Sequence, residues 1–171
     1  MTVIETAIAN HRAAIEEFLA AARAIDASNW SRPRAEGAWS PAQIAEHLAV
    51  VYEYNRSVAT GTAAEPIPRL FRPIVQPLAR RIVVDNTIAA GRFTRKGRAP
   101  RMFQPSAAPP ASGEVLARLD RAVRGLESDL RSRHPESRHT IAHPIFGTIP
   151  TDRWINLQAI HARHHCAQIA S

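Results

Sequence analysis

The chain has 171 residues, of which 45% are hydrophobic and 22% are charged, and its formal net charge is +7. This length allows one domain with a sizeable core, and no apolar run is long enough to span a membrane. Acidic residues stand near the start, where a signal peptide needs a basic patch and an apolar run, so we expect a cytoplasmic protein without a membrane partner. The single cysteine, Cys166, excludes an internal disulfide.

The first half of the chain contains two strong helix patterns. Apolar residues recur at helical spacing over residues 3–26, which predicts an amphipathic helix. After a loop, Ser40 can cap free amides, Pro41 suits the first helical position, and Gln43 completes a capping box. We therefore predict a second helix over residues 41–58.

A proline-rich stretch at residues 61–77 predicts short or interrupted structure. It is followed by a third predicted helix over residues 76–90. The apolar side of this helix would be formed by Leu78, Ile82 and Ile88.

Residues 91–112 are rich in proline, glycine and basic side chains and are predicted to form a long loop. Further helices are predicted over residues 113–133, stopped by Pro135, and over residues 152–170. No stretch alternates with period two for long enough to suggest a sheet. The prediction is one all-α domain over residues 1–171, a four-helix bundle with long connecting loops.

His161 and His165 are the histidines with the most informative spacing. Four residues apart on a helix, they project from the same face and can converge on one metal ion. Eight histidines in a chain of this length give roughly 0.4 such pairs by chance, so the pair needs support from elsewhere. His164 is an alternative to His165 in a different rotation of the helix.

His47 supplies that support. It lies among Ile44, Leu48 and Val51 on the apolar face of its predicted helix, so it should point into the bundle, where a buried imidazole needs a partner. Bundle-core metal sites are commonly built from side chains of facing helices. We predict a three-histidine site for a divalent ion with one or more coordination positions open.

The other histidines receive simpler interpretations. His11, His134 and His139 lie in polar surroundings and are expected at the surface. His143 precedes a proline in a predicted loop, where a structural hydrogen bond is expected.

Two segments at opposite ends of the chain resemble signatures of the DinB-like (DinB/YfiT) superfamily. GAWSPAQIAEHL at residues 37–48 resembles the first, and HPIFGTIPTDRW at 143–154 followed by HARHHCAQI at 161–169 resembles the last. RAPRMFQP at 98–105 is similar to segments in one branch of these proteins. The resemblance covers nearly the whole chain.

The resemblance implies a four-helix bundle in which His47, His161 and His165 bind a divalent ion, zinc or nickel. It also implies a metal-dependent transferase that adds a low-molecular-weight thiol to an electrophile. Metal chemistry adds a second possibility, a hydrolase in which an ion-bound hydroxide attacks an ester or amide, and in either case the substrate would be a small molecule. The alternative is a non-enzymatic or stress-related bundle whose ion is structural. An exposed helix face could support a homodimer.

Several nearby residues admit two interpretations. Trp39 and Trp154 either anchor helix starts or line the metal pocket. Gln168 could hydrogen-bond behind the ligands or pack at the helix end. Cys166 is expected in the core, and Glu46 is expected to face away from the site.

The basic loop at residues 92–101 is predicted to be solvated. An electropositive border that attracts an acidic substrate or a thiol cofactor is the second interpretation. Nucleic-acid binding ranks last, because only Phe93 and Phe103 could stack on bases.

Overall fold

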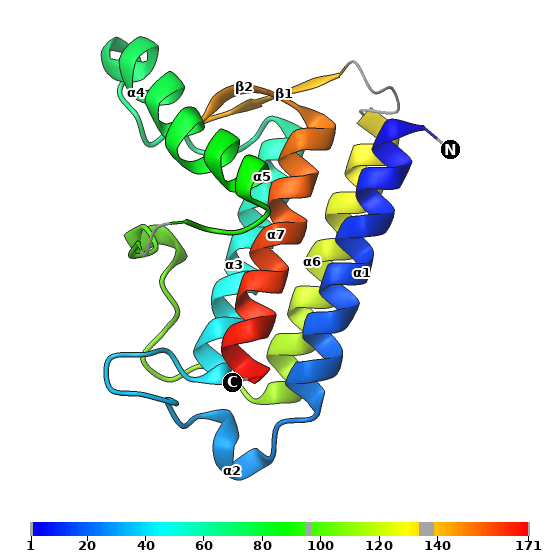
Figure 1. Ribbon diagram of the computed structural model, residues 1–171, viewed down its shortest axis with the longest axis vertical. Helices are drawn as coiled ribbons and strands as arrows, with labels where there is room; N and C mark the ends of the chain where they lie inside the picture. Colours follow the sequence, from blue (N-terminus) through cyan, green and yellow to red (C-terminus); the bar gives the residue numbers. More distant parts are fainter. Residues whose placement is uncertain (1, 95–96, 134–138, 171) are drawn as a thin grey trace.

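Four long helices lie side by side in the computed structural model, which describes residues 2–94, 97–133 and 139–170. They are α1 (Val3–Arg23), α3 (Pro41–Thr60), α6 (Ser112–Arg133) and α7 (Thr151–Ala170). α1 packs mainly on α7, and α3 mainly on α6 (Figure 1). The predicted all-α bundle is therefore confirmed, with helix ends within a few residues of those expected.

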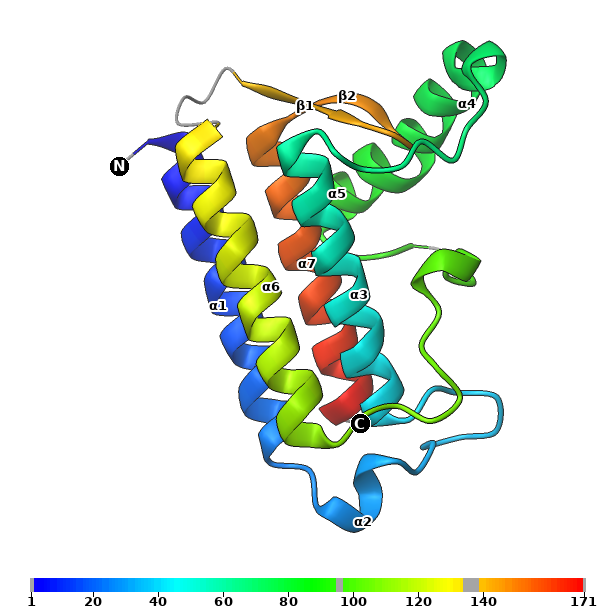
Figure 2. The same ribbon diagram turned by 180° about the vertical axis from the view of Figure 1, so that it is seen from behind.

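Shorter elements connect the long helices. They are α2 (Ala27–Trp30), η1 (Arg69–Phe71), α4 (Arg72–Ala79), the π-helical segment η2 (Arg80–Asp85), α5 (Asn86–Ala90), η3 (Arg101–Phe103), β1 (Thr140–His143) and β2 (Gly147–Pro150). The segment from η1 to α5 projects from one corner of the bundle, beside the two strands (Figures 1 and 2).

The start of α3 has the predicted capping box. The Ser40 hydroxyl accepts a hydrogen bond from the Gln43 amide at 3.3 Å, and the Gln43 side chain accepts one from the Ser40 amide at 2.9 Å. Pro41 occupies the first helical position. These local contacts determine where α3 begins, and hence which of its residues face the bundle interior.

The interior contains a polar network as well as a hydrophobic core. Contrary to the prediction, His11 is fully buried. Its Nδ1 lies 3.2 Å from Glu127 Oε1 and its Nε2 lies 2.9 Å from the Tyr52 hydroxyl, which donates to the Gln158 carbonyl. His11 therefore has polar neighbours in the sequence, but in the structure it lies inside the bundle. Its hydrogen-bond network connects α1, α3, α6 and α7. His139 is also only partly exposed.

The structure also contains one short hairpin, which no period-two pattern in the sequence had suggested. β1 and β2 form an antiparallel hairpin in which Ile141 pairs with Ile149 and His143 with Gly147. Each strand has four residues, so the alternation of buried and exposed side chains is too short to detect by periodicity. Gly147 adopts a positive φ of 70°, which suits the residue after a three-residue hairpin turn.

The third predicted helix begins before residue 76, and the first part of its apolar side faces solvent. Helical structure starts at residue 69, and Leu78 and Ile82, assigned to an inner face, are 56% and 36% exposed. Only the later part packs inward, through Val84 and Thr87.

Among the described residues, none of the helices combines the length and apolar character needed to cross a bilayer. The predictions for His134, Pro135, Arg95 and Lys96 concern positions outside the described residues.

Candidate metal centre

The three predicted histidines come together between α3 and α7. His161 Nε2 lies 3.0 Å from His165 Nε2 and 3.4 Å from His47 Nε2. All three ligand atoms are within 4.8 Å of one another. Ligands bonded to zinc at about 2.0–2.1 Å in a tetrahedron are about 3.3–3.4 Å apart, so the three side chains fit one ion with small adjustments.

Hydrogen bonds behind the cluster determine which imidazole nitrogens carry hydrogen. His47 Nδ1 lies 2.6 Å from the Phe103 carbonyl, and His165 Nδ1 lies 2.7 Å from Gln168 Oε1. Both oxygens can only accept, so each Nδ1 donates and each Nε2 presents a lone pair to the cluster. This is the arrangement in which metal-ligating histidines are commonly held.

His165, and not His164, belongs to the cluster. His165 is buried, whereas His164 is exposed, and its Nε2 lies 3.1 Å from the Gln168 side-chain nitrogen. Gln168 therefore bridges the two histidines and has the predicted place behind the ligands. Cys166 is partly buried against the core and does not join the three histidines.

The electrostatics of the cluster favour neutral imidazoles. Removal from water and, to a lesser extent, the neighbouring imidazoles together lower the pKa of His165 to about 3 and that of His161 well below its usual range. Burial also lowers the pKa of His47, against the opposing effect of the Phe103 carbonyl. All three rings are therefore unprotonated near neutral pH and available as ligands.

Two histidines of the cluster are buried and the third is partly exposed. His47 and His165 are 4% and 6% exposed, whereas His161 keeps partial exposure. Aromatic rings border it: the Trp39 ring centre lies 5.0 Å from that of His47, and the Phe93 ring centre lies 5.6 Å from that of His161. Trp39 thus lines the site, whereas Trp154 is fully buried in the core.

Glu46 supports the site through a loop, a role that the sequence did not reveal. As predicted, it faces away from the histidines, but it is only 8% exposed. Its Oε2 accepts hydrogen bonds from the Ser106 amide at 2.8 Å and hydroxyl at 2.9 Å. Because Phe103 is in the same loop, Glu46 helps to hold the carbonyl that orients His47.

Tyr54 is a second residue that sequence reasoning missed. It follows His47 by seven residues on α3, and its ring centre lies 5.0 Å from that of Phe103. Its hydroxyl is buried and meets no hydrogen-bond partner among the described residues. Burial raises the pKa of Tyr54, so the hydroxyl stays protonated.

His143, expected in a loop, ends strand β1 and has the predicted structural role. Its Nδ1 accepts hydrogen bonds from the amides of Ile145 at 3.1 Å and Phe146 at 3.3 Å. It therefore holds the hairpin turn together.

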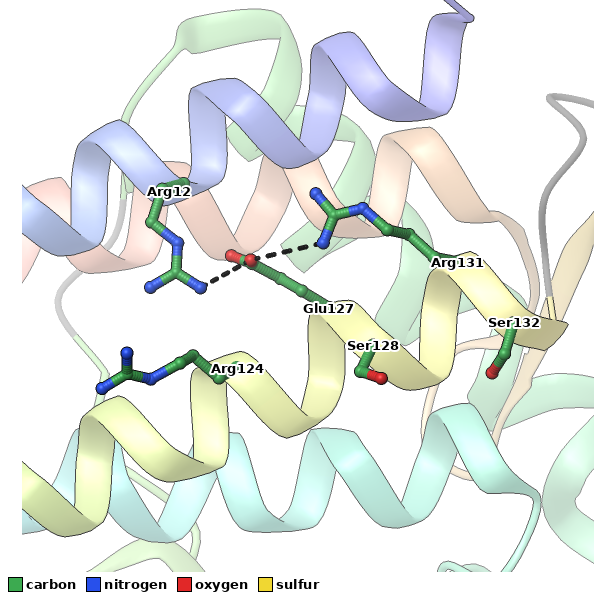
Figure 3. A pocket seen from close by; sticks show the side chains of 6 residues that line it. All are labelled: Arg12, Arg124, Glu127, Ser128, Arg131 and Ser132. Carbon is green, nitrogen blue, oxygen red and sulfur yellow. Dashed lines mark hydrogen bonds and ion pairs between the residues drawn. The ribbon is translucent and has the colours of Figure 1, made fainter.

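A groove on a different pair of helices offers no comparable chemistry. It lies between α1 and α6 (Figure 3) and is lined by Arg12, Arg124, Glu127, Ser128, Arg131 and Ser132. Arg12 pairs with Glu127 at 2.6 Å, Arg131 with Glu5 at 3.2 Å, and Arg124 with Asp120. Since each of its arginines already has a carboxylate partner, the groove presents no uncompensated charge to an anion.

Comparison with known proteins identifies the family but no individual relative. Neither the search of curated proteins nor that of solved structures gave a match. The family model described as the DinB superfamily matches residues 10–169, which include all three clustered histidines and nearly the whole bundle. The chain therefore belongs to the DinB superfamily.

Proposed function

We propose that this protein binds one divalent metal ion, zinc or nickel, through His47, His161 and His165 and presents it to a small molecule. The observation that carries the proposal is the convergence of three Nε2 atoms with two of the Nδ1 atoms hydrogen-bonded to oxygens behind them. The superfamily is often metal-binding, and imidazole nitrogens suit both metals.

The partial exposure of His161 favours an open coordination position over a closed structural site. A bound divalent ion would lower the pKa of a coordinated thiol or water and supply a nucleophile near neutral pH. We propose that the protein is a thiol-dependent transferase, with a metal-dependent hydrolase as the next candidate. The aromatic rings of Trp39 and Phe93 would border the bound molecule, and the Tyr54 hydroxyl could donate to it.

Metal content tests the site directly. The untagged protein is expected to carry one equivalent of metal, and the variants His47→Ala and His161→Ala are expected to lose it. His164→Ala is the matched control, because it removes a neighbouring imidazole outside the cluster and should retain the metal. Stoichiometric metal in either ligand variant would refute the site.

Ligand access is tested on protein loaded with Co²⁺, whose visible spectrum reports the atoms around the ion. Addition of a low-molecular-weight thiol is expected to change that spectrum through thiolate coordination. An unchanged spectrum across a panel of cellular thiols would contradict the thiol-dependent function. A spectrum insensitive to every small ligand would favour a structural ion.

A further inference from the structure

The segment from η1 to η2 turns its apolar side away from the protein. Leu70, Ile74 and Leu78 are 81%, 72% and 56% exposed. Eight large hydrophobic side chains are exposed in the part of the chain that the structure describes. Seven of them belong to this segment and to η3: Leu70, Phe71, Ile74, Val75, Leu78, Ile82 and Met102. Exposed large apolar side chains gathered on one helical segment of a folded domain are characteristic of an interaction site.

The polar side of the same segment attaches it to the hairpin. Gln76 donates to the Pro144 carbonyl at 3.0 Å, and Arg80 donates to the Thr148 carbonyl at 3.2 Å. Gln76 also lies over Gly147, where an added Cβ would meet Gln76 Oε1 at 3.4 Å. At the far end, Asp85 accepts from Arg153 of α7 at 3.0 Å. The segment projects beyond the bundle (Figures 1 and 2), and these contacts hold it with its apolar side chains exposed.

The net positive charge of the protein is concentrated in the same region. Residues 66–106 contain nine of the 22 basic residues and one of the 15 acidic residues. Their net charge is +8, and the remainder of the chain carries −1. Arg69, Arg81, Arg92, Arg98 and Arg101 are exposed there.

We propose that this apolar and basic surface docks on an anionic lipid bilayer. The side chains of Leu70, Ile74 and Leu78 would enter the boundary between headgroups and acyl chains, and the exposed arginines would meet lipid phosphates. A basic amphipathic helical segment with a strongly apolar side is the chemistry that binds in the plane of a membrane interface. The expectation of no membrane partner rested on the lack of an apolar run long enough to span a bilayer, whereas docking in the plane of the interface does not require such a run.

Two other partners, a second copy of the chain and a nucleic acid, fit this surface less well than a bilayer does. Two copies that met through this surface would each bring a region of net charge +8, and like charges opposed across an interface are unfavourable. A nucleic acid would neutralise the arginines but leave the apolar side chains in water. Only an anionic bilayer complements both properties, and the proposal is independent of the metal site.

Vesicle co-sedimentation of the full chain tests the proposal. The protein is expected to sediment with vesicles of phosphatidylcholine that contain phosphatidylglycerol, and not with vesicles of phosphatidylcholine alone. Binding should weaken as salt is raised, because salt screens the attraction between the arginines and the anionic headgroups. No sedimentation with the anionic vesicles would overturn the proposal.

Substitutions separate the apolar from the electrostatic contribution. Ile74→Gln and Leu78→Gln each remove an exposed side chain and are expected to weaken vesicle binding about tenfold or more. Arg81→Gln should weaken it about fivefold. Val3→Gln, which changes an exposed apolar residue of α1, and Arg23→Gln at the end of that helix are the matched controls and should bind as the unchanged protein does.

Two results would assign the surface differently. If Ile74→Gln bound anionic vesicles as tightly as the unchanged protein, the apolar side would not enter the bilayer, and the proposal would fail. If the protein were a dimer by light scattering, Ile74→Gln made it monomeric and neither bound vesicles, the surface would belong to a second copy of the chain.

Discussion

The roles of individual histidines depend on what each ring nitrogen contacts. In the cluster, the Phe103 carbonyl and Gln168 Oε1 accept from Nδ1 atoms and leave Nε2 lone pairs facing inward. His143 has the opposite arrangement, since its Nδ1 accepts from two backbone amides. His47 and His165 are therefore suited to coordinate an ion, and His143 to hold a turn.

His143 gives a prediction about the pH dependence of stability. Burial lowers its pKa to about 4 from an ordinary value of 6.5. Between these two values the unfolded chain binds a proton that the folded protein does not, so the free energy of unfolding falls as the pH is lowered. The fall due to this residue is roughly 2–3 kcal/mol between pH 7 and pH 4.5.

The variant His143→Asn should lack that part of the pH dependence. The asparagine oxygen can accept from the same two amides but does not titrate. Urea unfolding of both metal-free proteins at pH 7 and pH 4.5 measures the difference. The same loss of stability in both proteins would contradict the assignment of the buried, unprotonated state to His143.

At the scale of elements, the loop that contains η3 contacts helix α3 at two neighbouring residues, Glu46 and the proposed metal ligand His47. Glu46 holds Ser106, and the same loop brings the Phe103 carbonyl to His47. The carboxylate therefore acts on the proposed site without contacting it. This connection is invisible in the sequence, where Glu46 and Ser106 are 60 residues apart.

Glu46→Ala should therefore weaken metal binding. The loop would lose two hydrogen bonds, and loss of the support behind a ligand typically costs about 10–100-fold in affinity. Competition with a chromogenic chelator measures the change. Glu46→Gln keeps an acceptor and should bind more tightly than the alanine variant, whereas Glu53→Ala, on the same helix, should bind as the unchanged protein does. Equal affinity of Glu46→Ala and Glu53→Ala would contradict the role of the loop.

At the scale of the whole molecule, the proposed ion would join α3 to α7. It would bind the folded chain, because the three ligands lie up to 118 residues apart and converge only in the bundle. At free Zn²⁺ of about 100 times its Kd, such binding adds about 2.7 kcal/mol to the free energy of unfolding. For a chain of this length the Tm should rise by roughly 5–10 °C.

Scanning calorimetry with and without Zn²⁺ measures this rise. Mg²⁺ is the control ion, because it prefers oxygen ligands and should leave the Tm unchanged. The variant His161→Ala should show no rise with Zn²⁺. An equal rise in that variant would mean that the ion stabilises the protein from a different site.

The sequence by itself determined the features that depend on short separations along the chain. The capping box at Ser40 and Gln43, the four long helices and the placing of His161 and His165 on one face follow from helical periodicity and local hydrogen bonds. The hairpin was not predicted from the sequence, because strands of four residues are too short to show a clear period-two pattern.

Only the tertiary structure decided what depends on distant partners and on helix rotation. Neighbouring residues on a helix point about 100° apart, so His165 could be distinguished from His164 only once α7 was packed. His47 meets Phe103 and His161 across 56 and 114 residues. Burial of His11 and the outward apolar side of α4 are likewise set by what the rest of the chain covers, and local periodicity contains no information about that.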